Sequence, residues 1–153
     1  MKAVIQRVLR AEVETEGSVI ASSNEGLLIF LGIEKGDSEQ DIKYLAKKVS
    51  NLRVFDDDKG KMNLSIKDIG GEAMVISQFT LLADTKRGNR PSFERAEEPK
   101  RAKELYEKFI EEMKNSGVPV QSGRFGASMK ISLINNGPVT ILIGGGGGLV
   151  TPT

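Results

Sequence analysis

Hydrophobic residues along the chain follow two spacings, and each spacing predicts a different kind of element. Branched apolar residues are dense over residues 2–13, and residues 26–33 (GLLIFLGI) are apolar almost without interruption. Both stretches predict strands, the second one buried on both faces. Further strands are expected over residues 18–21, 53–55, 73–82, 118–122, 128–134 and 139–143, with a tight connection at 135–138.

Two other stretches repeat apolar residues every three to four positions, which predicts helices. The first follows Asp37 or Ser38, either of which can cap a helix, and reaches Leu52. The second begins at Pro99, a residue favoured at the first helical position, and is ended by Gly117. Two helices among so many strands favour an α+β fold, with a mainly antiparallel or mixed sheet, over a doubly wound parallel sheet.

A chain of 153 residues fits one domain, which we expect over residues 1–143. Residues 144–153 read as a glycine-rich tail, because the glycine run has no following Lys-Ser/Thr and therefore does not match a phosphate-binding loop. Residues 1–10 lack the continuous apolar stretch of a signal peptide, and no run approaches the ~18 apolar residues of a membrane span. We expect a cytoplasmic protein without membrane contact.

The sequence contains no histidine and no cysteine, which excludes several catalytic designs. Ser-His and Cys-His dyads, the usual general base and the usual zinc ligands are all absent. Three consecutive acids, Asp56 to Asp58, do not have the alternate spacing of a calcium loop and read as a solvated turn. We therefore expect neither a metal nor a cofactor.

The basic and acidic residues nearly balance, 22 against 21, so the net charge is only +1. Any contact with nucleic acid must then use a local patch. Residues 86–103 contain such an excess, seven basic against three acidic residues. The composition leaves two interpretations open here, a phosphate-binding surface and an ordinary solvated face.

Polar residues interrupt the apolar strand predicted at residues 73–82. Strand alternation would place Ser77 and Phe79 on one face, and Gln78 and Thr80 on the other. Two polar groups on one face can line a pocket, although threonine is also common in ordinary strands. These residues are therefore a candidate site, and both a pocket lining and an ordinary strand remain possible interpretations.

Gly137-Pro138 is a second local signal. A turn is its ordinary interpretation, but X-Pro bonds are also where cis peptides occur. A cis bond here would project the carbonyl oxygens of both residues in a fixed direction.

Taken in order, eight segments make the sequence resemble the D-aminoacyl-tRNA deacylase family, formerly called D-Tyr-tRNA deacylases. The segments are 1–8 (MKAVIQRV), 26–28 (GLL), 54–55 (VF), 60–63 (GKMN), 77–81 (SQFTL), 86–93 (KRGNRPSF), 122–129 (SGRFGASM) and 136–140 (NGPVT). They span residues 1 to about 143, and the eight segments together indicate the family far more specifically than any single segment does. Asn136 departs from the family, which commonly has Asp there, and the tail does not look like the usual ending.

The resemblance implies a homodimer of barrel-like subunits with two active sites at the interface, acting on the ester at the 3′ end of a D-aminoacyl-tRNA. It implies roles for the following residues: Ser77, Gln78, Phe79 and Thr80 as the pocket floor; Gly137 and Pro138 as a Gly-cis-Pro motif that enters the partner's pocket; Arg7 as its brace; Phe125 and Met129 at the adenosine end. The family is understood to use assistance from the tRNA itself.

The residues are consistent with that mechanism. Ester cleavage passes through an oxyanion that backbone N–H groups can stabilise. The terminal adenosine brings its own 2′-hydroxyl beside the ester. We therefore expect the main chain of Phe79 and Thr80 to hold the oxyanion, and the side chains of Gln78 and Thr80 to position rather than react.

The amino-acid sequence alone leaves two other classes of function open. A non-catalytic RNA-binding module would use the basic patch and protect the ester instead of cleaving it. A dimer that binds a small metabolite would use a pocket near Thr80, without salt-dependent affinity for tRNA.

Overall fold

The structure is a computed structural model that describes residues 1–144. Its sheet is organised by two long strands, β1 (Lys2–Thr15) and β8 (Lys130–Gly144), which pair antiparallel from end to end. Residues 145–153, which include all but the first residue of the expected tail, lie outside the described residues. Gly144 itself still pairs with Lys2.

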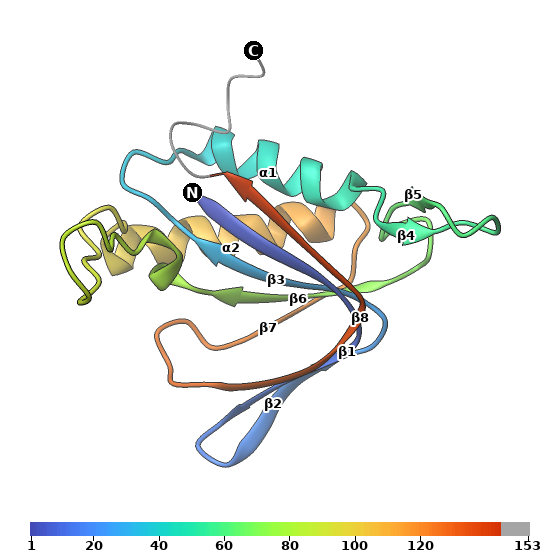
Figure 1. The fold of residues 1–153 in the computed structure, drawn as a ribbon, viewed down its shortest axis with the longest axis horizontal. Coiled ribbons are helices and arrows are strands. Elements are labelled where there is room, and N and C mark those ends of the chain that lie inside the picture. Colours follow the sequence, from blue (N-terminus) through green and yellow to red (C-terminus); the bar gives the residue numbers. More distant parts are fainter. Residues whose placement is uncertain (145–153) are drawn as a thin grey trace.

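The other edge of β1 pairs with two strands in succession. Its first half pairs with β3 (Gly26–Gly32) and its second half with β2 (Ser18–Ser23), both antiparallel. Beyond β3, the strands β6 (Glu72–Ser77) and β7 (Val120–Ser122) continue the sheet in parallel. The sheet is mixed and curls until it nearly closes into a barrel (Figure 1), which confirms the expected α+β class. A separate hairpin joins β4 (Phe55–Asp56) to β5 (Met62–Leu64).

Two helices cover one face of this sheet, α1 (Glu39–Asn51) and α2 (Pro99–Asn115) (Figure 1). Ser38 caps α1 in a reciprocal capping box with Asp41, and Pro99 starts α2, as predicted. Gly117 follows α2 with φ +93°, a conformation that glycine adopts freely. Within the described residues, no helix has the length and apolar character needed to cross a membrane.

The central strands β3 and β6 are buried on both faces, as the apolar run of β3 predicted. Leu27, Ile29 and Val75 face the helices, where they join the larger core with residues such as Phe109 of α2. Alternate residues, including Leu28, belong to a second core on the concave side of the sheet. The two cores explain why these strands carry almost no polar side chains.

The structure corrects two of the expected elements. The strand predicted over residues 73–82 ends at Ser77 and is followed by a 3₁₀-helix, η1 (Phe79–Leu82), so strand alternation does not apply to Ser77–Thr80. The tight connection predicted at 135–138 is absent, because β8 continues through it. Register shifts opposite Val8 absorb the irregular residues as bulges, and Asn135 accepts a hydrogen bond from the Val139 N–H (3.2 Å).

Gly26 gives a test of the β3–β6 pairing. A Cβ added at Gly26 would lie 1.8 Å from the Glu72 carbonyl oxygen, so the two backbones would have to separate. We expect Gly26→Ala to lower the free energy of unfolding by about 3 kcal/mol or more, measured by chemical denaturation. Ser22→Ala, at an exposed position of β2, is the control and should change it by less than about 0.5 kcal/mol.

Tyr106 gives a test of how α2 is held against β6. Its buried hydroxyl donates to the Val75 carbonyl (2.9 Å), and burial raises the pKa of Tyr106 to about 12. An unfolded tyrosine has a pKa near 10. The stability that this difference contributes is therefore present below pH 10 and is lost as the pH rises from about 10 toward 12.

We expect Tyr106→Phe to cost about 1 kcal/mol of unfolding free energy at pH 7 and to flatten the decline above pH 10. Denaturation curves at several pH values measure both effects. Tyr44→Phe on α1 is the control, since its hydroxyl has no hydrogen-bond partner among residues 1–144. An unchanged decline above pH 10 in Tyr106→Phe would contradict the assignment.

Candidate functional site

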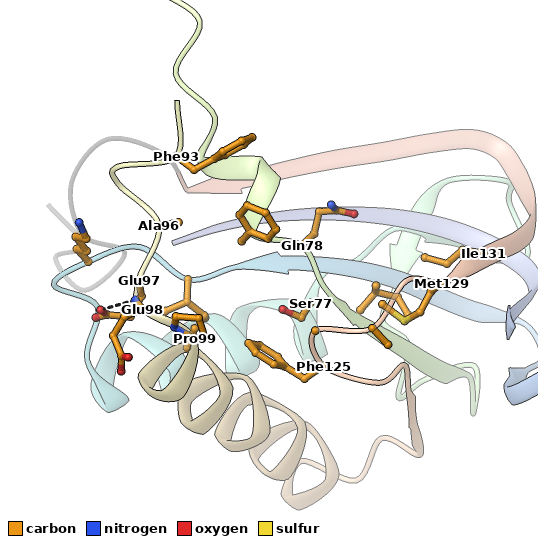
Figure 2. Close-up of a pocket in the computed structure, with 17 residues that line it drawn as sticks. Ser77, Gln78, Phe93, Ala96, Glu97, Glu98, Pro99, Phe125, Met129 and Ile131 are labelled. Carbon is orange, nitrogen blue, oxygen red and sulfur yellow. Dashed lines mark hydrogen bonds between the residues drawn. The ribbon is translucent and has the colours of Figure 1, made fainter. Parts of the chain in front are cut away.

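A cavity of about 670 Å³ opens where β6 ends, between η1, the start of α2 and the segment 123–129. Seventeen residues line it: Ile33, Lys35, Ile76, Ser77, Gln78, Phe79, Phe93, Ala96, Glu97, Glu98, Pro99, Ala102, Phe125, Gly126, Ala127, Met129 and Ile131. Figure 2 shows the Ser77 side chain near the middle, with Met129 to one side and Glu97 and Glu98 to the other. Five of the predicted site residues therefore meet in one cavity.

Contacts with the end of β3 hold the turn from β6 into η1. The Gln78 N–H donates to the Leu31 carbonyl (2.8 Å), and Leu82 of η1 is fully buried. Gly32 lets η1 approach, because a Cβ there would lie 2.6 Å from Leu82 Cδ2 and 2.9 Å from the Gln78 carbonyl oxygen. The 3₁₀ turn therefore depends on packing against β3, and the sequence of residues 73–82 alone does not predict it.

The turn presents main-chain N–H groups and one paired hydroxyl. As the first residues of η1, Phe79 and Thr80 have N–H groups without acceptors in the helix, and neither donates elsewhere among the described residues. The Gln78 amide donates to the Thr80 hydroxyl. Because an amide is not a base at neutral pH, Thr80 has no group beside it that would activate it as a nucleophile. Thr80 itself does not line the cavity.

Aromatic and sulfur-containing side chains form the apolar wall. Phe125 packs edge-to-face on the buried Tyr106, with ring centroids 5.7 Å apart. Gly123 allows Met129 to approach, because a Cβ there would lie 2.6 Å from the Met129 sulfur. Phe79, which is 56% exposed, meets Phe93 edge-to-face at 5.1 Å. A flat, mostly apolar ligand would fit between such walls.

Ion pairs tie the cavity's rim to the end of β3. Arg95 donates to Glu34 (2.8 Å), and the N-terminal ammonium of Met1 lies 2.9 Å from Asp37. Burial alone would raise the pKa of Glu34, but the hydrogen bond from Arg95 and the nearby ammonium hold it below its usual value. Burial is the main cause that raises the pKa of Asp37. The Arg95–Glu34 pair and the hydrogen bond from the Lys35 N–H to the Arg95 carbonyl (2.9 Å) fix the segment that carries Phe93.

Arg7 lies apart from the cavity and has three partners. Its buried guanidinium donates to the carbonyls of Asn136 (2.9 Å) and Val54 (2.8 Å), and pairs with the Asp56 carboxylate at 3.3 Å. A planar guanidinium suits such a forked arrangement. Arg7 thus connects β1, the β4 hairpin and the middle of β8.

Directly after Asn136, the Gly137-Pro138 peptide bond is cis, and both residues are exposed. Neither lines the cavity of its own chain. On β3, the partner of Arg7 (Leu27) lies four residues from the partner of Ser77 (Leu31), a separation of about 13 Å along the strand. The structure therefore gathers the predicted site residues into two groups.

Two contributors were missed at the sequence level. Phe93 belongs to a recognised segment, but nothing in its spacing indicated contact with Phe79. The sequence indicates that Asp56 belongs to a solvated turn, whereas in the structure it pairs with Arg7. Its neighbour Asp57 does hold the turn, since it accepts from the N–H groups of Lys61 and Lys59, which lower its pKa. Among the described residues no acidic cluster could hold a metal ion.

Comparison with known proteins identifies the family of the chain. The family described as D-Tyr-tRNA(Tyr) deacylase matches residues 4–144. A D-aminoacyl-tRNA deacylase of Aquifex aeolicus is 58% identical over 94% of this chain and 97% of its own length. The enzyme of that name from Thermodesulfovibrio yellowstonii is 54% identical over 94% of this chain and 98% of its own length.

Solved structures support the same fold. A c-Myc DNA Unwinding Element Binding Protein has a TM-score of 0.89 and 36% identity, covering 96% of this chain and 100% of that one. A probable eukaryotic D-amino acid tRNA deacylase has a TM-score of 0.79 at 12% identity, covering 93% and 97%, which speaks for the fold alone. On the family match and the sequence relatives together, this chain belongs to the D-Tyr-tRNA(Tyr) deacylase family, a family of hydrolases that act on the ester bond of aminoacyl-tRNA.

Proposed function

We propose that residues 1–143 form a single deacylase domain that hydrolyses D-aminoacyl-tRNA, and also glycyl-tRNA, into free tRNA and amino acid. The observation that carries the proposal is the turn at Ser77–Thr80, which presents unpaired N–H groups beside a cavity that no histidine or cysteine lines. The two carboxylates that do line it, Glu97 and Glu98, accept hydrogen bonds from main-chain N–H groups at the start of α2. Family membership supports the substrate class. Because aminoacyl-tRNA is the substrate, the enzyme acts in the cytoplasm, where translation occurs.

The reaction breaks the bond between the acyl carbon and the ribose 3′ oxygen. Water adds to the carbonyl, the 3′ oxygen leaves with a proton, and the amino acid leaves as a carboxylate with release of one proton. With no histidine or cysteine in the chain, the 2′-hydroxyl of the terminal ribose activates the water or the ester. The N–H groups of Phe79 and Thr80 stabilise the oxyanion.

Within this scheme the side chains of the turn have positioning roles. Gln78 holds the Thr80 hydroxyl, so neither group is available as a base. Phe125 and Met129 contact the terminal adenosine along the apolar wall, and Ser77 lies on the floor. The arrangement suits an enzyme that contributes shape and dipoles while the RNA contributes the reactive group.

Gly137 and Pro138 select the stereoisomer. Their carbonyl oxygens leave room only for hydrogen on one side of the amino acid's Cα, so L isomers clash, whereas D isomers and glycine enter. The hydrogen bond from Arg7 to the preceding carbonyl of Asn136 supports this role, because it holds the segment from a buried anchor.

The selecting residues come from a second copy of the chain, in a homodimer with two active sites at the interface. Support comes from their exposure and their distance from the cavity of their own chain. Leu142, four residues after Pro138 on β8, is 75% exposed. An exposed apolar side chain next to the motif fits a contact between copies.

The central test is deacylation of matched D-, L- and glycyl-tRNA. We expect the D and glycyl esters to be cleaved and the L ester to be spared, with little dependence on side-chain identity among D substrates. A D-aminoacyl-tRNA ending in 2′-deoxyadenosine should be hydrolysed at least 100-fold more slowly.

Thr80→Ala completes that test. Since its hydroxyl positions rather than reacts, we expect activity to fall less than about tenfold, against the 10²–10⁴-fold that removal of a general base causes. Full-speed hydrolysis of the deoxy ester, or equal rates on D and L esters, contradicts the mechanism. Protection of the ester would instead indicate an RNA-binding module.

The homodimer is tested by Leu142→Glu. A charge at this exposed position of β8 should raise the dimer dissociation constant by at least tenfold in sedimentation measurements, because it would be desolvated at the interface. D-specific activity should fall in parallel. Met62→Glu on β5, 56% exposed, is the control and should change neither. A wild-type chain that is monomeric and fully active would refute the arrangement.

A further inference from the structure

The basic excess of residues 86–103 divides into two parts once ion pairs are considered. Arg95 pairs with Glu34 at 2.8 Å, Arg101 with Glu104 at 3.1 Å, and Lys103 lies 4.0 Å from Glu107. Lys86, Arg87, Arg90 and Lys100 have no acidic partner among residues 1–144, and all four are exposed. The first three lie together in residues 86–90, which we call the basic loop.

The basic loop leaves directly from the cavity's rim. Its base is closed by two hydrogen bonds between the main chains of Asp84 and Ser92 (2.8 and 2.9 Å). The Asp84 carboxylate also accepts from the Lys86 N–H (2.9 Å). Phe93, three residues after Arg90, lines the cavity and packs on Phe79; Figure 2 shows it at the rim, where the chain runs away from the site.

Together these features combine the two elements of a single-stranded nucleic-acid site, cations that follow the backbone and an aromatic ring open for stacking. Phe79 remains 56% exposed beside the loop. The three cations also account for more than the net charge of +1, so the rest of the chain is slightly acidic. Within residues 86–103, three of the four unpaired cations therefore lie together at this edge of the cavity, where they can attract a polyanion.

We propose that the basic loop contacts the phosphates of the tRNA strand that precedes the terminal adenosine, and so holds that strand in line with the cavity. This inference rests on the proposed function and names the part of the chain that binds the substrate beyond its last nucleotide. The loop acts on binding of the strand, not on the chemistry of the ester.

The test measures the activity of one triple variant, Lys86→Gln/Arg87→Gln/Arg90→Gln, on two substrates and compares it with the wild type. On D-aminoacyl-tRNA at low salt we expect kcat/KM to fall at least tenfold through KM, with kcat retained. The slope of log kcat/KM against log salt should become shallower by about 2, since each phosphate contact with a single strand contributes about 0.7. On D-aminoacyl-adenosine, which has no phosphate, the variant should match the wild type within about twofold.

A charge-matched control removes three exposed lysines of α1, in Lys43→Gln/Lys47→Gln/Lys48→Gln. It should keep the wild-type salt slope, because α1 carries no part of the cavity. The proposal is overturned by an unchanged slope in the loop variant, by an equal change in the α1 variant, or by an equal loss on D-aminoacyl-adenosine. A wild-type chain that cleaves no D-aminoacyl ester would refute the proposed function instead.

Discussion

The turn from β6 into η1 is the constraint on which the candidate site depends. Its position is set by the hydrogen bond from Gln78 to Leu31, by the burial of Leu82 and by the close approach that Gly32 permits. In the proposed mechanism, the groups offered to a reacting ester are main-chain N–H groups of this turn. Under that proposal, the packing of β3 against η1 fixes where the chemistry occurs, as a catalytic side chain does in other hydrolases.

Elements with local signals were predictable from the sequence. The capping box at Ser38, Pro99 at the start of α2 and the doubly buried run of β3 all agree with the structure. The 3₁₀ turn was missed because residues 78–82 look like a strand, and only Gly32, some fifty residues earlier, makes room for them. The sequence at residues 135–138 predicts a turn, but pairing with β1 keeps the chain extended there, so the continuous strand β8 was not predicted.

The family resemblance assigned candidate site residues, but it did not show how the fold arranges them. Recognised segments contain Ser77, Phe125 and Met129, which the fold brings together, and also Arg7, which it places elsewhere. Charge partners are the clearest example of what sequence hides. Asp56 reads as part of a solvated turn, yet it is the carboxylate nearest to a buried guanidinium, because β4 is brought beside β1.

The separation of the two groups of residues links activity to assembly. The cavity is built from β6, η1 and α2, whereas the segment held by Arg7 lies in the middle of β8, where Gly137 and Pro138 are exposed. If the selecting carbonyls belong to a second copy, a single chain contains both halves of a site and cannot join them. Hydrolysis and discrimination would then depend on the concentration of the chain, because partner binding completes the pocket by mass action. Selection would then have two structural requirements. The exposed apolar side chains of β8 would bring the two copies together, and the hydrogen bonds of Arg7 would fix the position of the Gly137-Pro138 carbonyls.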